Sequence, residues 1–161
     1  MTDKKEKPKP HHKKQRLYIC VDFDGTCVTH EYPDIGREIG AAFVLKRLVE
    51  HGHRIILHTM RSGLGLEAAV GWFRYHDIPL YGVNENLSQK TWTDSRKVHG
   101  NIYIDDAALG CPLIYDKETD QAYVNWNEVE YLLMMRGLFE SAPTTNIRTN
   151  ECPKICVQED E

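Results

Sequence analysis

Long apolar runs are missing from this sequence of 161 residues. A membrane-spanning helix needs about 20 consecutive apolar residues, and the basic, polar first residues contain no short apolar core of a secretory signal. With 41% hydrophobic and 27% charged residues, the composition is typical of a globular protein. We therefore expect a cytoplasmic protein that has no contact with a membrane.

A regular cysteine framework is also missing. The chain has five cysteines, an odd number without the spacing of a disulfide scaffold, which favours reduced thiols in a reducing compartment. Cys152 and Cys156 lie close together, but no second pair of Cys or His residues stands near them in the sequence. Two thiols in a loose tail are therefore a better interpretation than a metal site.

Basic residues outnumber acidic residues at the N-terminus but not in the rest of the chain. Residues 1–16 carry seven Lys or Arg and two Asp or Glu, although the whole chain has a net charge of −4. Residues 1–15 have no hydrophobic periodicity and predict a disordered basic arm, residues 141–161 predict a flexible tail, and residues 16–140 would form the domain. The arm, residues 1–16, could attract nucleic acid, with a merely solvated tail as the alternative.

Short apolar segments alternate with amphipathic ones between these two ends. Such alternation predicts an α/β fold with a three-layer, Rossmann-like parallel sheet flanked by helices. The expected strands are 17–23, 54–59, 80–83 and 101–106, the expected helices are 37–51, 64–76 and 127–138, and a strand, turn and return strand are expected over 112–126.

Polar side chains follow the expected parallel strands, at the edge where ligands bind in such sheets. Four carboxylates gathered there could not all stay ionised without a cation, and an all-oxygen set favours Mg²⁺ as the cofactor. The residues concerned are Asp22 and Asp24, then Thr59 and Arg61, then Asn84, and finally Asp105 and Asp106.

Carboxylates beside Mg²⁺ can transfer a phosphoryl group. One carboxylate can attack phosphorus and form an aspartyl-phosphate, and a second, two positions along, can protonate the leaving oxygen and then activate water. Thr59 could donate a hydrogen bond to a phosphoryl oxygen. Lys97 could neutralise charge in the transition state, with Lys90 as the alternative.

The order of these residues resembles the haloacid dehalogenase (HAD) superfamily of phosphatases. "DFDGT" at 22–26 is similar to its first motif and Thr59, at the end of "RIILHT", to its second. Lys97 in "SRKVHG" is similar to the third and "YIDD" at 103–106 to the fourth. The resemblance covers residues 17–126.

That resemblance implies a role for each matching residue. Asp22 would be the nucleophile and a metal ligand, and Asp24 the general acid and base, binding metal through its backbone carbonyl. Asp106 would be a direct ligand supported by Asp105. We assign Gly25, Thr26, Arg61 and Asn84 to substrate binding, with Gly25 also permitting a tight turn; a surface ion pair is the alternative for Arg61.

Neither segment between the motifs is long enough for a separate cap domain, so the resemblance implies a capless enzyme with an open site and "CVTHEYPDIG", 27–36, as its nearest equivalent of a lid. The segments "GHRIILHTMR", "YGVNEN" and "SRKVHGNIYIDDAALG" resemble a group of small HAD-like hydrolases of bacteria and phages.

The sequence therefore predicts a Mg²⁺-dependent phosphatase for a phosphorylated small molecule or nucleic-acid end, with a homodimer as one possible assembly. Phosphoryl transfer to an acceptor other than water, a nucleic-acid-associated module that uses the basic arm, and a degenerate scaffold are the alternatives.

Overall fold

The computed structural model describes residues 15–118 and 120–139. A parallel sheet of four strands forms its centre, in the order β3-β2-β1-β4. The predicted α/β architecture is confirmed. The predicted arm at 1–15, apart from Gln15, and the tail at 141–161 with Cys152 and Cys156 lie outside the described residues. The strands are β1 (Tyr18–Val21), β2 (Arg54–Leu57), β3 (Leu80–Val83) and β4 (Ile102–Ile104).

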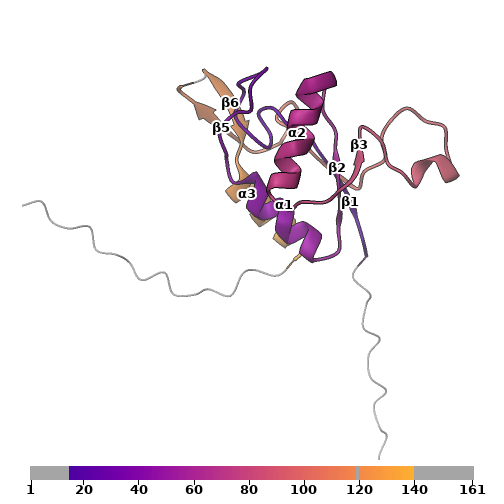
Figure 1. Cartoon of the computed structure of the whole chain (residues 1–161). Coiled ribbons are helices and arrows are strands. Elements are labelled where there is room, and N and C mark those ends of the chain that lie inside the picture. The colour runs from indigo at the N-terminus through magenta and orange to yellow at the C-terminus, as the bar shows by residue number, and fades with distance from the viewer. Residues whose placement is uncertain (1–14, 119, 140–161) are drawn as a thin grey trace, which may run out of the picture.

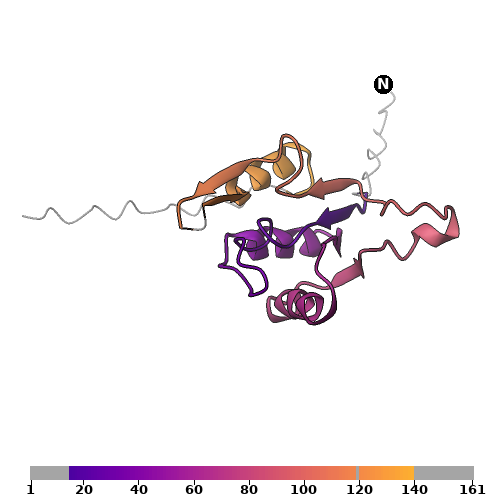
Figure 2. The ribbon, with the colours of Figure 1, turned by 90° about the horizontal axis from the view of Figure 1, so that it is seen from above.

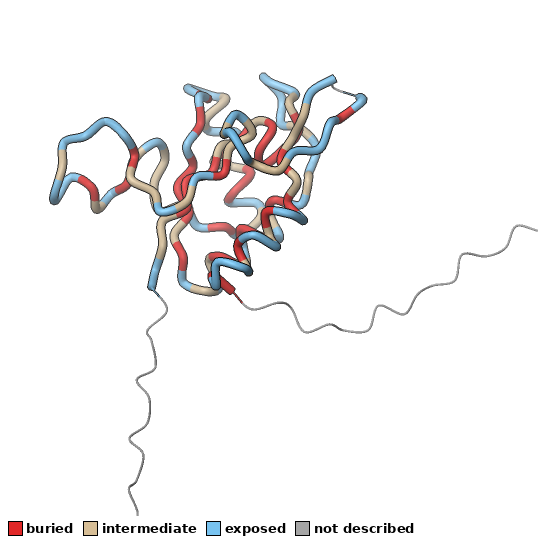
Figure 3. The backbone as a smooth tube through the Cα atoms, turned by 180° about the vertical axis from the view of Figure 1, so that it is seen from behind, coloured by how far each residue is buried: buried red, intermediate tan, exposed pale blue. Residues whose placement is uncertain are grey.

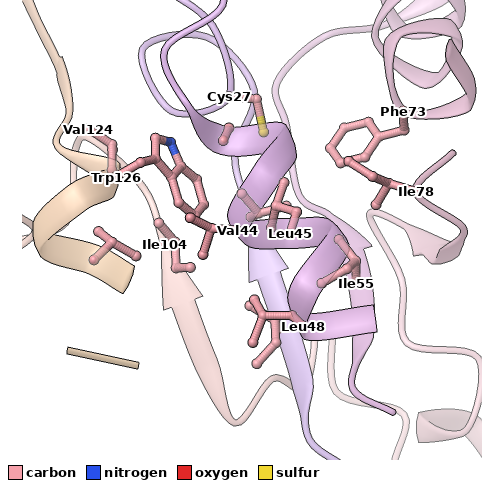
Figure 4. Close-up of a cluster of buried hydrophobic side chains, with 14 of the residues drawn as sticks. Cys27, Val44, Leu45, Leu48, Ile55, Phe73, Ile78, Ile104, Val124 and Trp126 are labelled. Atoms are coloured by element: carbon pink, nitrogen blue, oxygen red, sulfur yellow. The ribbon is translucent and has the colours of Figure 1, made fainter. Parts of the chain in front are cut away.

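Three α-helices cover one face of this sheet (Figure 2). Their apolar stripes pack on the β1 and β2 side chains that point to this face, among them Ile19, Val21, Ile55 and Leu57. Figure 4 shows part of this core, where Leu45 and Leu48 lie against Ile55. The helices are α1 (Ala41–Glu50), α2 (Gly63–Tyr75) and α3 (Trp126–Met135).

The connection between β3 and β4 lies on the opposite side of the sheet from the helices and contains a short 3₁₀ helix, η1 (Gln89–Thr91). Cys20 and Ile56 point to this face and pack against Val98 of the connection. Figure 3 shows that the connection projects from the body and that its buried stretches are short. This face is therefore more open than the helical face.

A two-stranded antiparallel hairpin lies at the end of the sheet where the parallel strands finish (Figure 1). It consists of β5 (Leu113–Asp116) and β6 (Gln121–Val124), and the backbone N–H of Val124 donates to the carbonyl of Gly25 at 2.8 Å. The hairpin is therefore attached to the turn after β1. Within the described residues, the segments after β1 and after β2 contain loops, single elements and no separate domain.

No helix in the described part of the chain is long and apolar enough to cross a membrane.

Candidate functional site

The carboxylates that follow β1 and β4 meet at one edge of the sheet. Strand β1 pairs in parallel with β4, and the N–H of Asp22 continues this pairing by donating to the carbonyl of Ile104 at 3.0 Å. As a result, one carboxylate oxygen from each of Asp22, Asp105 and Asp106 lies within 4.8 Å of the other two. Three hard oxygen donors at this spacing fit a divalent cation such as Mg²⁺.

Burial and the neighbouring acids act together on Asp22. Loss of solvent is the largest cause, and the charges of Asp105, Asp106 and Asp24 add to it, so that the pKa of Asp22 rises to about 7. A backbone hydrogen bond at Phe23 acts in the opposite direction. A cation bound between these carboxylates would favour the ionised form of Asp22.

The turn after β1 is formed by backbone bonds and by Gly25. Gly25 has a φ of +71°, so the predicted need for glycine at this turn is confirmed. Thr26 is fully buried; its hydroxyl lies 3.3 Å from Oδ1 of Asp106 and accepts from the N–H of Asp106 at 3.0 Å. The side chain of Thr26 thus joins the first turn to the acids after β4.

His30 also lies in the acidic cluster. Its Nε2 is 3.0 Å from Oδ2 of Asp106, and its ring lies directly against Gly25, where an added Cβ would be 2.0 Å from Nε2. Because His30 lies four residues beyond the DFDGT segment, motif spacing gives little indication of this contact. It depends on how the 27–36 loop folds back.

Asp24 is turned toward a buried arginine. Arg61 donates from Nε and Nη2 to the two Asp24 oxygens at 2.8 and 2.7 Å, and only 1% of its side chain is exposed. These hydrogen bonds raise the pKa of Arg61 above its ordinary value. In this arrangement the guanidinium binds Asp24 rather than facing solvent; a role in binding substrate stays a prediction.

Arg61 also holds the 27–36 loop. Its Nη1 donates to the carbonyl of Pro33 at 3.1 Å and its Nη2 to that of Asp34 at 2.6 Å. The guanidinium lies between the rings of Phe23 and Tyr32, 5.0 and 5.1 Å from their centres. One buried cation therefore fixes both Asp24 and the nearest equivalent of a lid.

Thr59 and Asn84 are joined at the ends of β2 and β3. The side chain of Asn84 accepts from the N–H of Thr59 at 2.8 Å and donates to its carbonyl at 2.9 Å. Asn84 adopts a φ of +52°, which asparagine tolerates better than most residues. The amide of Asn84 is therefore engaged with the Thr59 backbone, and its predicted contact with substrate stays untested.

The two candidate lysines lie in different surroundings. Lys97 is exposed, and its Nζ lies 5.9 Å from the centre of the Tyr103 ring on β4. Lys90 pairs with Glu85 at 3.0 Å. Tyr103 lies on β4 and Asp105 directly follows that strand, so Lys97 lies beside the strand that precedes the acids.

Comparison with known proteins gives one informative match. No family model matches the chain, and no curated protein does. A solved structure, that of the conserved protein coded by a locus from Bacteroides thetaiotaomicron, is 32% identical, has a TM-score of 0.63, and its match covers 76% of this chain and 93% of that one. The chain belongs to the same family as this bacterial protein. Shared family membership supports the parallel α/β fold but does not name a reaction.

Proposed function

We propose that this member of the family is a Mg²⁺-dependent phosphomonoesterase of the HAD type. The observation that carries the proposal is the approach of Asp22, Asp105 and Asp106 to within 4.8 Å at the ends of two paired strands. The order of the motifs along the chain is the second support. Asp22, Asp105 and Asp106 would hold Mg²⁺, together with the Asp24 carbonyl. The metal would supply charge neutralisation for the phosphate and the carboxylates.

Asp22 would act as the nucleophile. One of its carboxylate oxygens would attack phosphorus, the bond to the ester oxygen would break, and the phosphoryl group would remain on Asp22 as an aspartyl-phosphate. A proton from the Asp24 carboxyl would go to the departing alcohol. Lys97 and the hydroxyl of Thr59 would stabilise the negative charge that develops on the phosphoryl oxygens.

Water would complete the reaction. The Asp24 carboxylate would take a proton from water as its oxygen attacks phosphorus, which breaks the bond to Asp22 and releases inorganic phosphate. Because each Asp24 oxygen accepts a hydrogen bond from Arg61, Asp24 must take up a proton on a lone pair that Arg61 leaves free before it can donate that proton. Leaving groups that depart without a proton avoid this first requirement.

Hydrolysis of an aryl phosphate tests the proposal. We expect turnover with Mg²⁺ and no turnover with EDTA. With an alkyl phosphate, whose leaving group is poor, both Asp22→Asn and Asp24→Asn should lose turnover. With an aryl phosphate, Asp24→Asn should transfer the phosphoryl group to Asp22 faster than Asp22→Asn releases the aryl alcohol. Asp94→Asn, an exposed acid in the β3–β4 connection, is the matched control. Turnover that survives in Asp22→Asn would contradict the proposal. Analysis of the products formed with added alcohols distinguishes hydrolysis from phosphoryl transfer to an acceptor other than water.

A further inference from the structure

The open face of the sheet leads directly to the acidic cluster. Cys20 of β1 is in register with Ile56 of β2 and with Tyr103 of β4, and Cys20 and Ile56 point to the face that the β3–β4 connection covers. Since strand side chains alternate between faces, the next row on this face is Asp22, His58 and Asp105. A substrate bound at the acids would thus extend along the strands onto this face.

Aromatic rings border that path. Tyr103 is 41% exposed on β4, and its ring lies 6.4 Å from that of His58, which immediately precedes Thr59. Trp92, 62% exposed, meets His99 edge to face at 5.3 Å. The core of this face is already formed by Cys20, Ile56 and Val98, so it does not require these two exposed rings.

A cavity of about 280 Å³ lies between Tyr103 and Trp92. This volume is near the lower end of the range of about 300–1,000 Å³ for small-molecule sites, and it therefore suits one flat ring system. Thr93 and Ser95 line it; each hydroxyl accepts a backbone N–H at 3.2 Å and can still donate its own proton. Lys97 also lines the cavity and adds positive charge.

The cavity is shaped by internal hydrogen bonds. Nε2 of Gln89 donates to the carbonyls of Ser95 and Lys97 at 2.7 and 2.8 Å, and its Oε1 accepts from the N–H of His99 at 2.7 Å. The Tyr103 hydroxyl accepts from the N–H of Gly100 at 3.0 Å. These bonds fix the connection over the sheet, so the cavity is formed before any ligand arrives.

We propose that this cavity binds the base of a nucleotide whose phosphate lies at the Asp22 cluster. Aromatic faces, hydroxyl donors and a lysine are the groups that recognise a base and its phosphate, whereas a sugar phosphate has no flat aromatic ring to stack on them. The inference rests on the proposed phosphatase site, and it names nucleotides as the substrate class. The nucleotide can be free or can be the phosphorylated end of a strand.

Fluorescence of Trp92 gives a test that does not depend on turnover. Trp72 and Trp126 are 9% and 3% exposed, so Trp92 is the tryptophan in contact with solvent among those described. We expect adenosine monophosphate, added with Mg²⁺ to the Asp22→Asn protein, to quench this fluorescence with saturation. Glucose 6-phosphate should not quench it, and Trp92→Phe should remove the signal. A 5′-phosphorylated oligonucleotide in a parallel titration distinguishes a strand end from a free nucleotide.

Tyr103→Leu provides the second arm. Loss of the ring should weaken nucleotide binding about tenfold, measured by calorimetry, and leave glucose 6-phosphate unaffected. Tyr103→Phe, which keeps the ring but loses the hydroxyl bond to Gly100, should retain nucleotide binding. Tyr75→Leu is the matched control, because Tyr75 is exposed on α2, at the opposite face of the sheet. Equal affinities for the nucleotide and the sugar phosphate, unchanged in Tyr103→Leu, would overturn the inference.

The two proposals fail in different ways. If aryl phosphate is hydrolysed but nucleotides are not preferred, the base site is wrong and the phosphatase stands. If adenosine monophosphate quenches Trp92 and no phosphate ester is hydrolysed, the base site stands and the phosphatase is wrong.

Discussion

Arg61 and Asp24 form a two-point ion pair in which Nε and Nη2 donate to separate carboxylate oxygens at 2.8 and 2.7 Å. The pair joins the segment between β2 and α2 to the turn after β1. Since Arg61 also holds the Pro33 and Asp34 carbonyls, a single side chain connects an acid of the proposed site to the loop beside it.

Replacing Arg61 by lysine should therefore destabilise the protein despite keeping the charge. Lysine cannot make the planar two-point contact, and loss of a hydrogen bond between charged groups at the partly buried Asp24 costs about 2 kcal/mol of unfolding free energy. Chemical denaturation measures this loss. Arg74→Lys, at an exposed position near the end of α2, should change stability little. If Arg61→Lys and Arg74→Lys unfold at the same denaturant concentration, the ion pair does not hold the loop.

Asp22 should make the metal-free protein less stable as the pH rises. Its pKa is about 7 in the folded state against an ordinary 3.8, so folding favours the protonated form. The stability that this proton confers is complete below pH 4 and is lost as the pH approaches and passes 7. In EDTA, Asp22→Asn should be about 2 kcal/mol more stable than the wild type at pH 8 and nearly equal to it at pH 4.

Denaturation of Asp22→Asn at several pH values, with Asp94→Asn as the exposed control, checks this dependence. Added Mg²⁺ should stabilise the wild type at pH 8 and reduce the difference between the two proteins, because ligand that binds only the folded state raises stability. If the difference in unfolding free energy between Asp22→Asn and the wild type does not vary with pH, then burial and the neighbouring acids do not raise the pKa of Asp22.

Trp126 supports the turn that carries Gly25 and Thr26. Its Nε1 donates to the Thr26 carbonyl at 2.6 Å within the core. Trp126→Phe leaves this buried carbonyl without its donor, which costs about 1–3 kcal/mol. Trp92→Phe, on the exposed connection, should cost less than about 0.5 kcal/mol. Thermal unfolding compares the two, and similar melting temperatures would mean that the indole bond adds nothing to the turn.

Hydrophobic periodicity predicted the sheet and its helices because each element buries the side on which its apolar residues lie. The α1 positions Ala41, Val44, Leu45 and Leu48 are all buried as the pattern indicates, and β3 has the predicted bounds. The ends of elements differ by a few residues, since side-chain burial constrains the middle of an element more strongly than its ends. The 3₁₀ helix η1 has no periodic signal in three residues, and it was not predicted.

The acids of the site could be predicted from their positions after strands, because parallel strands bring their carboxyl ends to one edge. The partners of those acids could not. Arg61 was expected to contact substrate or to form a surface pair, yet its side chain is 1% exposed, a result of the 27–36 loop folding over it. His58 and Tyr103 share a face with Asp22 only through strand register, and register is not visible in one strand alone.

His30 should hold Asp106 in the orientation that binds metal. Nε2 of His30 lies 3.0 Å from Oδ2 of Asp106, and partners that orient a metal-binding carboxylate typically change metal affinity by about 10- to 100-fold when removed. His30→Leu should therefore weaken Mn²⁺ binding, measured by electron paramagnetic resonance, by at least about tenfold. His30→Gln should retain most of the affinity, because its amide can donate the same bond. His76→Leu, after α2, is the control. If His30→Leu binds Mn²⁺ as tightly as His76→Leu, then Thr26 and the backbone alone orient Asp106.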